Sequence, residues 1–308
     1  MNVNGCDCSI VIKTASREMS SPQSGDVRFT TPLTRLNEWL DVPYSNETIR
    51  EAVSFLQEQA AIEGDGACRG LLKSNGVTGC IITPLTISTV PLLLHLAMGS
   101  SGLPVFISET RNLYRHSLSL LPFEDGPRFD LVQARGDGKW LYENCGVKGF
   151  ELRVQKEEAI QLKLDIAGEQ APVNYPYNEK PEMDDGERFS GDGVKYKING
   201  KEYKNIYGIV LNSKKDEGTK TELWIKRSLE QGDFTSQNSD IPHLIDELTI
   251  TAQLFCEKYE YRHFGMFRLT LTHLVLTSDE TTINSPDTVI GPMRYYVAGT
   301  VKAEVFTS

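Results

Sequence analysis

The chain has 308 residues, of which 39% are hydrophobic and 24% are charged. That composition excludes a disordered chain and allows one large or two small domains with a sizeable core. The formal net charge of −10 argues against sequence-specific nucleic-acid binding, which depends on a basic face, although an acidic excess often serves solubility alone. No apolar run is long enough to span a membrane and the first residues lack a signal-peptide pattern, so we expect no membrane contact and a protein that stays or assembles in a cytosol.

Six cysteines are dispersed along the chain, and only Cys6 and Cys8 lie close together. The sequence has no CxxC motif and no histidine at zinc-ligand spacing from a cysteine pair. A single CxC pair is a weak metal or redox signal. Because free thiols are the rule in a cytosol, we predict unpaired cysteines and no metal site.

Residues 1–60 are interpreted as an N-terminal arm with a helical segment. The helix is predicted over residues 47–59, because Ile49, Val53 and Leu56 share one face at helical spacing. The same segment could equally become a strand near its end.

The clearest helix is predicted over residues 89–98, directly after a short strand. Ser88 can cap its start, Pro91 falls in its first turn, and Gly99 can end it in the left-handed conformation. The segment is apolar nearly all round, so we expect it to be buried against a sheet or a neighbouring subunit. The side chains expected in this buried helix are Leu92, Leu93, Leu94, Leu96 and Met98.

Much of the chain shows the alternation of polar and apolar residues that is typical of half-buried β-strands. In residues 160–166, for example, the isoleucines and leucines face one way and the polar residues the other. Asn199-Gly200 is the best signal for a type I′ hairpin turn. Strands are predicted over residues 9–13, 77–83, 116–121, 129–134, 140–142, 150–154, 160–166, 194–198, 205–212, 221–227, 248–256, 266–277 and 295–306.

These elements predict a mainly β protein with an antiparallel β-sandwich or barrel-like fold, one buried flanking helix and minor helices. Residues 61–168 form its first part and residues 194–308 its second part, which includes a short helix over residues 242–247. Between the two parts, residues 169–193 are acidic and rich in proline. We interpret them as a long exposed loop or linker, which in a compact fold is usually functional or disordered.

Sequence motifs for nucleotide binding and hydrolysis are missing: there is no GxxxxGKS/T, no GxGxxG after a strand, no GxSxG and no HExxH. The five histidines are predicted to be structural, with His95 favoured by the C-terminal end of its helix. The acidic run around Asp184 and Asp185 could bind a hard cation, but its spacing does not fit an EF-hand loop. We therefore predict that the protein is not an enzyme and has no catalytic, cofactor-binding or metal-binding residues.

The order of elements in most of the chain resembles a known family. A strand over residues 79–86 leads into the leucine-rich segment 91–99, which ends in glycine. Further segments follow in the same order over residues 116–120, 129–132, 142–152, 162–168, 267–271 and 295–306. From about residue 77 to the end, this arrangement resembles the major tail tube proteins of tailed phages and prophages.

The resemblance implies a β-sandwich protomer with a flanking helix that assembles into hexameric rings, which stack to form the tail tube of the virion. It implies assembly in the cytoplasm of a bacterial host and a lumen through which DNA is ejected without sequence-specific binding. The implied partners are other copies of the chain and the tape-measure, tail-terminator and baseplate proteins. An acidic charge suits such a conduit, because DNA must slide past its wall without sticking.

In this hypothesis, two loops are candidates for contacts between protomers or rings, residues 65–75 and residues 169–193. Their candidate residues are Asp65, Asn75, Asp184, Asp185 and Glu187. Three alternatives stay open. The chain could be another tail component, such as a distal tail or tail-completion protein, a non-viral β-sandwich binding module, or a hydrolase whose carboxylates are brought together by folding.

Overall fold

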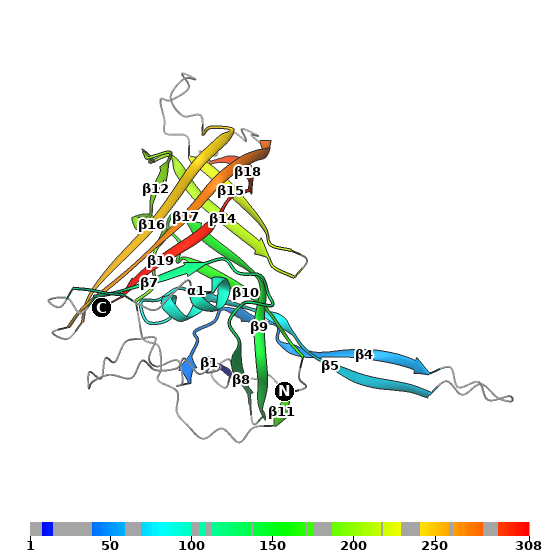
Figure 1. Ribbon diagram of the computed structural model, residues 1–308. Coiled ribbons are helices and arrows are strands. Elements are labelled where there is room, and N and C mark those ends of the chain that lie inside the picture. The colour runs from blue at the N-terminus through cyan, green and yellow to red at the C-terminus, as the bar shows by residue number, and fades with distance from the viewer. Residues whose placement is uncertain are drawn as a thin grey trace.

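The fold is given by a computed structural model that describes residues 8–14, 39–58, 69–99, 105–108, 113–136, 138–169, 172–174, 187–216, 218–228, 241–258, 261–279 and 289–307. In these residues, nineteen strands form one hydrogen-bonded network around one α-helix (Figure 1). Every pairing between these strands is antiparallel. The predicted mainly β, sandwich- or barrel-like class is therefore confirmed, and the sheet does not close on itself.

The front layer in Figure 1 is built around the longest strand, β17 (Tyr261–Asp279). One side of β17 pairs with β16 (Leu244–Lys258), and the first half of its other side pairs with β19. The strand order in this layer is β6–β7–β19–β17–β16–β12–β13. The remaining bounds are β6 (Val105–Ser108), β7 (Leu113–Ser119), β12 (Lys195–Ile198), β13 (Lys201–Tyr203) and β19 (Val301–Thr307).

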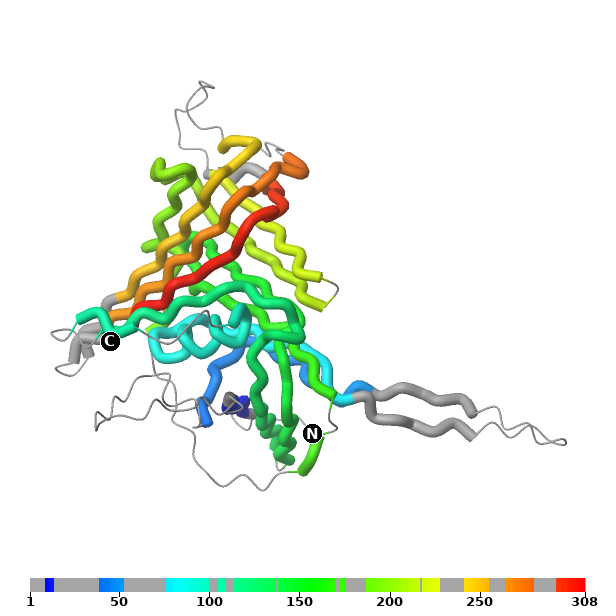
Figure 2. The backbone as a smooth tube through the Cα atoms, viewed as in Figure 1, coloured from blue at the N-terminus to red at the C-terminus, as the bar shows by residue number. Residues whose placement is uncertain are grey.

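The back layer begins at β17 as well, because from Leu274 onward this strand pairs with β18 instead of β19. Its strand order is β18–β15–β14–β9–β10–β5–β4, and the short β3 also pairs with β5. Figure 2 shows the front strands crossing diagonally in front of this layer. The bounds are β3 (Asn46–Glu47), β4 (Arg50–Glu58), β5 (Arg69–Pro84), β9 (Gly138–Gln155), β10 (Gln161–Gly168), β14 (Ile206–Lys214), β15 (Lys220–Ser228) and β18 (Val289–Val297).

A smaller sheet branches from β9. Up to Cys145, β9 pairs with β8, whereas from Gly146 onward it pairs with β10 of the back layer. The order in the smaller sheet is β2–β1–β8–β9–β11. Its other strands are β1 (Cys8–Thr14), β2 (Leu40–Asp41), β8 (Phe129–Arg135) and β11 (Val173–Asn174).

The helix α1 (Val90–Met98) shares one apolar core with the two layers. It contacts β7 and β19 of the front layer and β9 of the back layer, and Figure 1 shows it below β7. The predicted buried helix is confirmed, because every leucine in it and Met98 are at most 8% exposed. Burying one leucine side chain fully contributes about 1.5–3 kcal/mol. The helix therefore fills the open end of the sandwich.

The start of α1 is held by two threonines and not by Ser88, the predicted cap. Thr89 is the N-cap residue, and the Thr86 hydroxyl accepts a hydrogen bond from its N–H at 3.1 Å. In return, the Thr89 hydroxyl accepts from the Thr86 N–H at 3.3 Å. This reciprocal pair satisfies backbone donors that are buried at the helix start. At the other end, Gly99 has a φ of 109° and a ψ of 172°, so φ is positive, but the predicted left-handed helical conformation is wrong.

A buried lysine of the back layer caps the C-terminal end of α1. Lys215, only 1% exposed, directly follows β14 and donates from Nζ to the Ala97 carbonyl oxygen at 2.8 Å. A lysine suits this position, because the last carbonyls of a helix carry partial negative charge. Burial, with a smaller effect of Arg128, lowers the pKa of Lys215 to about 8. The helix is thus fixed to the back layer by a polar contact as well as by packing.

The helix predicted over residues 47–59 is wrong, since the described part of this segment forms β3 and β4. Strand β4 pairs with β5 from Arg50, opposite Thr78, to Glu58, opposite Arg69. The apolar residues have helical spacing, but hydrogen bonds to the partner strand β5 decide the conformation of this segment.

The short helix predicted over residues 242–247 is also wrong, because β16 begins within it at Leu244. The backbone N–H groups of Asp246 and Glu247 both donate to the Asn199 side-chain oxygen at 3.0 Å. A side chain from a distant hairpin thus satisfies donors that a helix would have used internally.

Two further predictions, one of a turn and one of a strand, have different outcomes. The predicted Asn199-Gly200 turn is confirmed, with φ of 50° and 81°, both positive as a type I′ turn requires. The single strand predicted over residues 295–306 is wrong, since it divides into β18 and β19. The intervening Gly299 N–H donates to the Thr272 carbonyl oxygen at 3.1 Å, which lets the chain step from the back layer to the front layer.

Shortening one core leucine tests the role of α1. We expect Leu93→Ala to lower the free energy of unfolding by about 2–5 kcal/mol, because Leu93 is 0% exposed and its loss leaves a cavity. The matched control is Leu244→Ala at a site that is 58% exposed, with an expected loss of about 0.5 kcal/mol or less. Urea unfolding of both variants is the measurement, and equal losses would contradict the buried position of α1.

A second test uses the histidines between α1 and the front layer. Burial lowers the pKa of His95, and this effect outweighs the partial negative charge at the helix end that we expected to favour a histidine there. Burial, and to a smaller extent the charge of His95, lowers the pKa of His116 to about 4. The unfolded chain, with a histidine pKa near 6.5, therefore takes up the proton first, so the stability linked to His116 is complete above pH 6.5 and is lost as the pH falls toward 4.

We expect His116→Gln to flatten this acid limb, because glutamine keeps a polar side chain next to Thr307 but does not titrate. Melting temperatures of the variant and the parent protein should differ in slope between pH 6.5 and pH 4. Carboxylates titrate in both proteins and cancel in the comparison. Parallel curves would show that His116 is not buried in its neutral form.

Candidate functional site

The residues predicted from the sequence as contact sites fall on different parts of the fold. Asn75 lies in strand β5, so its assignment to a loop is wrong. Glu187 is exposed, and its carbonyl oxygen accepts from the Ile87 N–H at 3.2 Å, just before α1. Asp65, Asp184 and Asp185 lie outside the described residues. The structure therefore brings none of the described candidates together into one site.

The described free cysteines differ in burial, Cys80 being half-buried and Cys145 buried. Burial raises the pKa of Cys145 to about 12, which keeps its thiol protonated and unreactive. Within the described ranges, no group of three or more His, Cys, Asp or Glu side chains is placed to hold a metal ion. The remaining candidate sites are surfaces that could bind another protein.

A two-stranded ribbon projects from the body. Its strands are β4 and the first part of β5, residues 69–74, which pair with each other from Val53, opposite Ser74, outward. Only the later part of β5, from Val77 to Pro84, also pairs with β10 of the back layer. Figure 1 shows the ribbon extending from the body to the right, away from the front strands. The ribbon thus offers backbone groups away from the protein's own core.

A glycine permits the close packing where the ribbon leaves the body. Gly76 has a φ of 98°, and a Cβ atom there would lie 1.9 Å from the Gly168 carbonyl oxygen. No other residue could adopt this backbone without moving β10. The ribbon base is therefore fixed in position by sequence and by packing.

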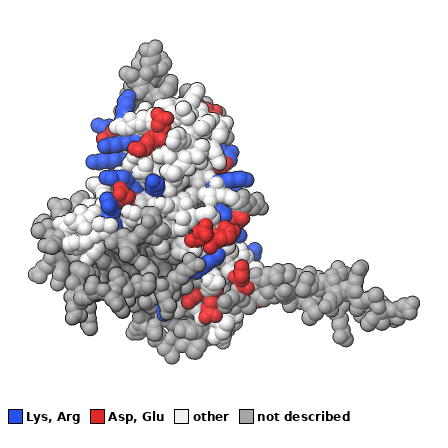
Figure 3. Space-filling model, viewed as in Figure 1, with Lys and Arg blue, Asp and Glu red and all other residues white. Residues whose placement is uncertain are grey.

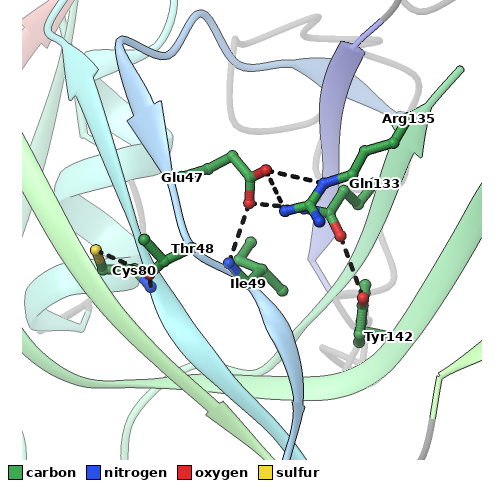
Figure 4. Close-up of polar contacts among 7 residues, drawn as sticks. All are labelled: Glu47, Thr48, Ile49, Cys80, Gln133, Arg135 and Tyr142. Atoms are coloured by element: carbon green, nitrogen blue, oxygen red, sulfur yellow. Dashed lines mark hydrogen bonds and ion pairs between the residues drawn. The ribbon is translucent and has the colours of Figure 1, made fainter. Parts of the chain in front are cut away.

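A largely buried carboxylate joins the back layer to the smaller sheet (Figure 4). Glu47, in β3, has a side chain only 13% exposed. Its Oε2 accepts from the Ile49 N–H at 3.0 Å and from Gln133 Nε2 at 2.6 Å. Its Oε1 accepts from Arg135 Nε at 3.0 Å and from Arg135 Nη2. Four donors on one carboxylate compensate the cost of burying its charge.

The same network continues into the smaller sheet. Gln133 is 2% exposed, and its Oε1 accepts from the Tyr142 hydroxyl at 3.1 Å. On the other side, the Thr48 hydroxyl accepts from the Cys80 N–H of β5 at 3.1 Å. The contacts span β3, β5, β8 and β9, so Glu47 links the back layer to the smaller sheet, beside the stretch of β5 that pairs with β10. We call this set the Glu47 junction.

Large apolar side chains are exposed at three places on the surface. Three lie on β6, three lie side by side across β16, β17 and β18, and two lie in the smaller sheet. Exposed apolar groups of this kind often mark sites where another protein binds. They are Val105, Phe106 and Ile107; Leu244, Val275 and Tyr296; and Trp140 and Val173.

The outer face of the front layer is polar and carries several basic residues. Glu304 of β19 is paired with Arg268 at 3.3 Å and, more loosely, with Arg115 at 3.8 Å. Lys195 and Lys197 of β12 are exposed. On the face shown in Figure 3, Lys and Arg side chains gather along one side of the upper body.

Sequence analysis missed the surfaces that the fold makes most distinctive. Glu47 contacts residues of β8 far along the chain, and no local pattern signals such a contact. Val105-Phe106-Ile107 was visible as a short apolar run, but its exposure depends on where β7 lies. A scan of protein-family models and a search of curated proteins both gave no match. In the described part, no helix has the length and apolar character needed to cross a membrane.

Neutralising the junction carboxylate tests its contribution. We expect Glu47→Gln to lower the free energy of unfolding by about 1–3 kcal/mol, because an amide N–H₂ would face donors in a buried site. Glu222→Gln is the matched control, since Glu222 pairs with Arg294 at 2.7 Å on an exposed surface, where such pairs contribute about 0–1 kcal/mol. Urea unfolding should separate the two, and an equal or smaller loss for Glu47→Gln would contradict the account of the junction.

Proposed function

We propose that this chain is a structural virion protein whose copies assemble into hexameric rings, stacked as the tail tube of a phage or prophage. The observation that carries the proposal is the open sheet. Among the described residues, β13 pairs only with β12, and β4 pairs only with β5. In the described part, one end of the front layer and one end of the back layer are therefore left with unpaired backbone edges.

Unpaired edges favour association with further copies. A bare strand edge presents N–H and C=O groups that can pair with another chain, and soluble monomers normally cover such edges. A ring of identical subunits removes them, because the edge of each copy is covered by its neighbour. The open sheet thus supports a protein that is completed by other copies of itself.

The ribbon supports the same proposal. A two-stranded hairpin standing alone in water is only marginally stable, so it gains most from packing on another surface. Gly76 packs against the Gly168 backbone at the base of the ribbon, which keeps the ribbon's direction defined relative to the body. Asn75 follows the ribbon within β5, and Asp65 follows β4 in the sequence, so residues 65–75 remain the proposed contact segment between rings or protomers.

In this function, other copies of the chain are the main partner, together with tape-measure, tail-terminator and baseplate proteins. The tube is assembled in the bacterial cytoplasm and resides in the virion tail. DNA passes through its lumen without sequence-specific binding, to which the net charge of −10 is suited. The chain itself performs no catalysis.

Two alternatives use the same fold. Another tail component, such as a distal tail or tail-completion protein, would form a single ring that does not stack. A non-viral β-sandwich binding module would use the exposed apolar strands for a different partner and would stay monomeric alone.

Electron microscopy of the purified full-length chain in negative stain tests the proposal, with sedimentation velocity over a range of protein concentrations. Stacked rings or open tubes with a stain-filled lumen are the expected result. Rings that never stack would favour the other tail components. A single monomeric species at every concentration would overturn the proposed function.

A further inference from the structure

The turn between β12 and β13 consists of an asparagine followed by a glycine, Asn199-Gly200. Both residues are exposed, with φ values of 50° and 81°. An Asn-Gly pair can modify itself, because the backbone nitrogen after the asparagine can attack the side-chain amide carbon of the same chain. Such an attack needs no second molecule to be brought into place, so the environment of the turn decides whether it proceeds.

The side-chain carbonyl group of Asn199 is held by two backbone donors. Asp246 and Glu247 of β16 each donate their N–H to Asn199 Oδ1 at 3.0 Å. Because both partners are donors, the amide atom that faces them must be the oxygen and not the nitrogen. Negative charge develops on this oxygen when a nucleophile attacks the amide carbon, and fixed N–H groups stabilise such a charge. The fold therefore activates the carbon that would be attacked.

The attacking and leaving groups at the turn are unhindered. In the described part of the chain, neither the Gly200 N–H nor the Asn199 Nδ2 group donates a hydrogen bond to another residue. A Cβ atom on Gly200 would meet no atom within 4 Å beyond its chain neighbours. The Asn199 N–H, in contrast, donates to the Glu247 carbonyl oxygen at 2.8 Å. The asparagine is thus anchored to β16 while its reacting groups stay free.

We propose that Asn199-Gly200 is a self-modification site, at which Asn199 loses its side-chain nitrogen. The Gly200 nitrogen gives its proton to solvent and forms a bond to Asn199 Cγ. The bond between Cγ and Nδ2 then breaks, and Nδ2 takes up a proton and leaves as ammonia. Water opens the resulting cyclic imide at either of its carbonyl groups, which yields aspartate or isoaspartate. This inference concerns the single chain and does not depend on the proposed function.

The two products differ in their effect on the fold. Aspartate keeps an acceptor oxygen for the N–H groups of Asp246 and Glu247. Isoaspartate carries the main chain through its side-chain carbon, which lengthens the turn by one atom. Because the length of a turn fixes the register of its hairpin, we expect isoaspartate to loosen β13, which pairs only with β12 in the described ranges.

A second Asn-Gly pair provides a control with the same chemistry in a closed environment. Asn75 lies in β5 and is followed by Gly76, which is buried. A Cβ atom on Gly76 would lie 1.9 Å from the carbonyl oxygen of Gly168 in β10. Ring closure at Asn75 therefore requires β5 and β10 to separate. A third pair, Asn4-Gly5, lies outside the described residues.

Peptide mapping by mass spectrometry tests the inference on the purified full-length chain. The protein is incubated in mildly alkaline buffer and then digested in water labelled with heavy oxygen, which marks any conversion that occurs during digestion. We expect Asn199 to be converted at least about tenfold faster than Asn75, because the reaction at Asn75 must wait for a local opening of the sheet. Fragmentation of the modified peptide should show isoaspartate as well as aspartate.

A variant at the nucleophile provides a second test that leaves Asn199 and its two donors unchanged. Aspartate tolerates a positive φ better than most residues, and the open space at Gly200 accommodates its side chain. We expect Gly200→Asp to slow the conversion of Asn199 at least about tenfold, because the added Cβ crowds the attacking nitrogen. An unchanged rate in a variant that circular dichroism shows to be folded would mean that the Gly200 nitrogen is not the nucleophile, and the inference would be wrong.

A synthetic peptide with the sequence of residues 195–204 is the positive control for the chemistry. If this peptide is converted while Asn199 of the folded chain stays intact, the fold protects the turn and the inference is overturned. Equal rates at Asn199 and Asn75 would also contradict it, since the fold would then not select the site. Tubes or rings in the microscope bear only on the proposed function, so either proposal can fail while the other stands.

Discussion

The fold depends on two long strands that each pair into two sheets. The first part of β17 pairs with β19 and its last part with β18, so the hydrogen-bonded network must divide there into a front and a back layer. In the same way, β9 pairs first with β8 and then with β10, which attaches the smaller sheet. Each strand can satisfy its backbone groups on only two sides. The layers therefore diverge, α1 fills the space between them, and the outer strands are left as edges.

Burial and exposure in this arrangement serve different purposes. The apolar faces and α1 supply a single core, and two polar devices fix its parts: Lys215 at the end of the helix and Glu47 at the branch between sheets. What remains on the surface is unusual for a self-sufficient domain, because two described strands, β13 at one end of the front layer and β4 at the end of the back layer, are each paired on one side only. A rigid body with open edges is physically suited to repeat in a larger assembly, which is why we favour a structural role.

The sequence predicts those elements of the fold that depend on neighbouring residues. The alternation in residues 160–166, the Asn199-Gly200 turn and the leucine-rich helix were all found, because their causes lie within a few residues. Both wrongly predicted helices became strands, one paired with β5 and the other held by the Asn199 side chain. Such partners come from distant parts of the chain, as do the donors around Glu47 and the exposure of β6. Only the folded chain could identify these surfaces.

Hydrogen–deuterium exchange of the backbone amides tests most directly whether other copies complete the open sheet. The amides of the edge strand β13 would be compared between monomers and assemblies of the same protein. Strand β10, which is paired on both sides by β5 and β9, provides the internal reference. The account predicts that exchange in β13 becomes at least about tenfold slower on assembly while exchange in β10 stays nearly unchanged. Equally fast exchange of β13 in monomers and assemblies would contradict it.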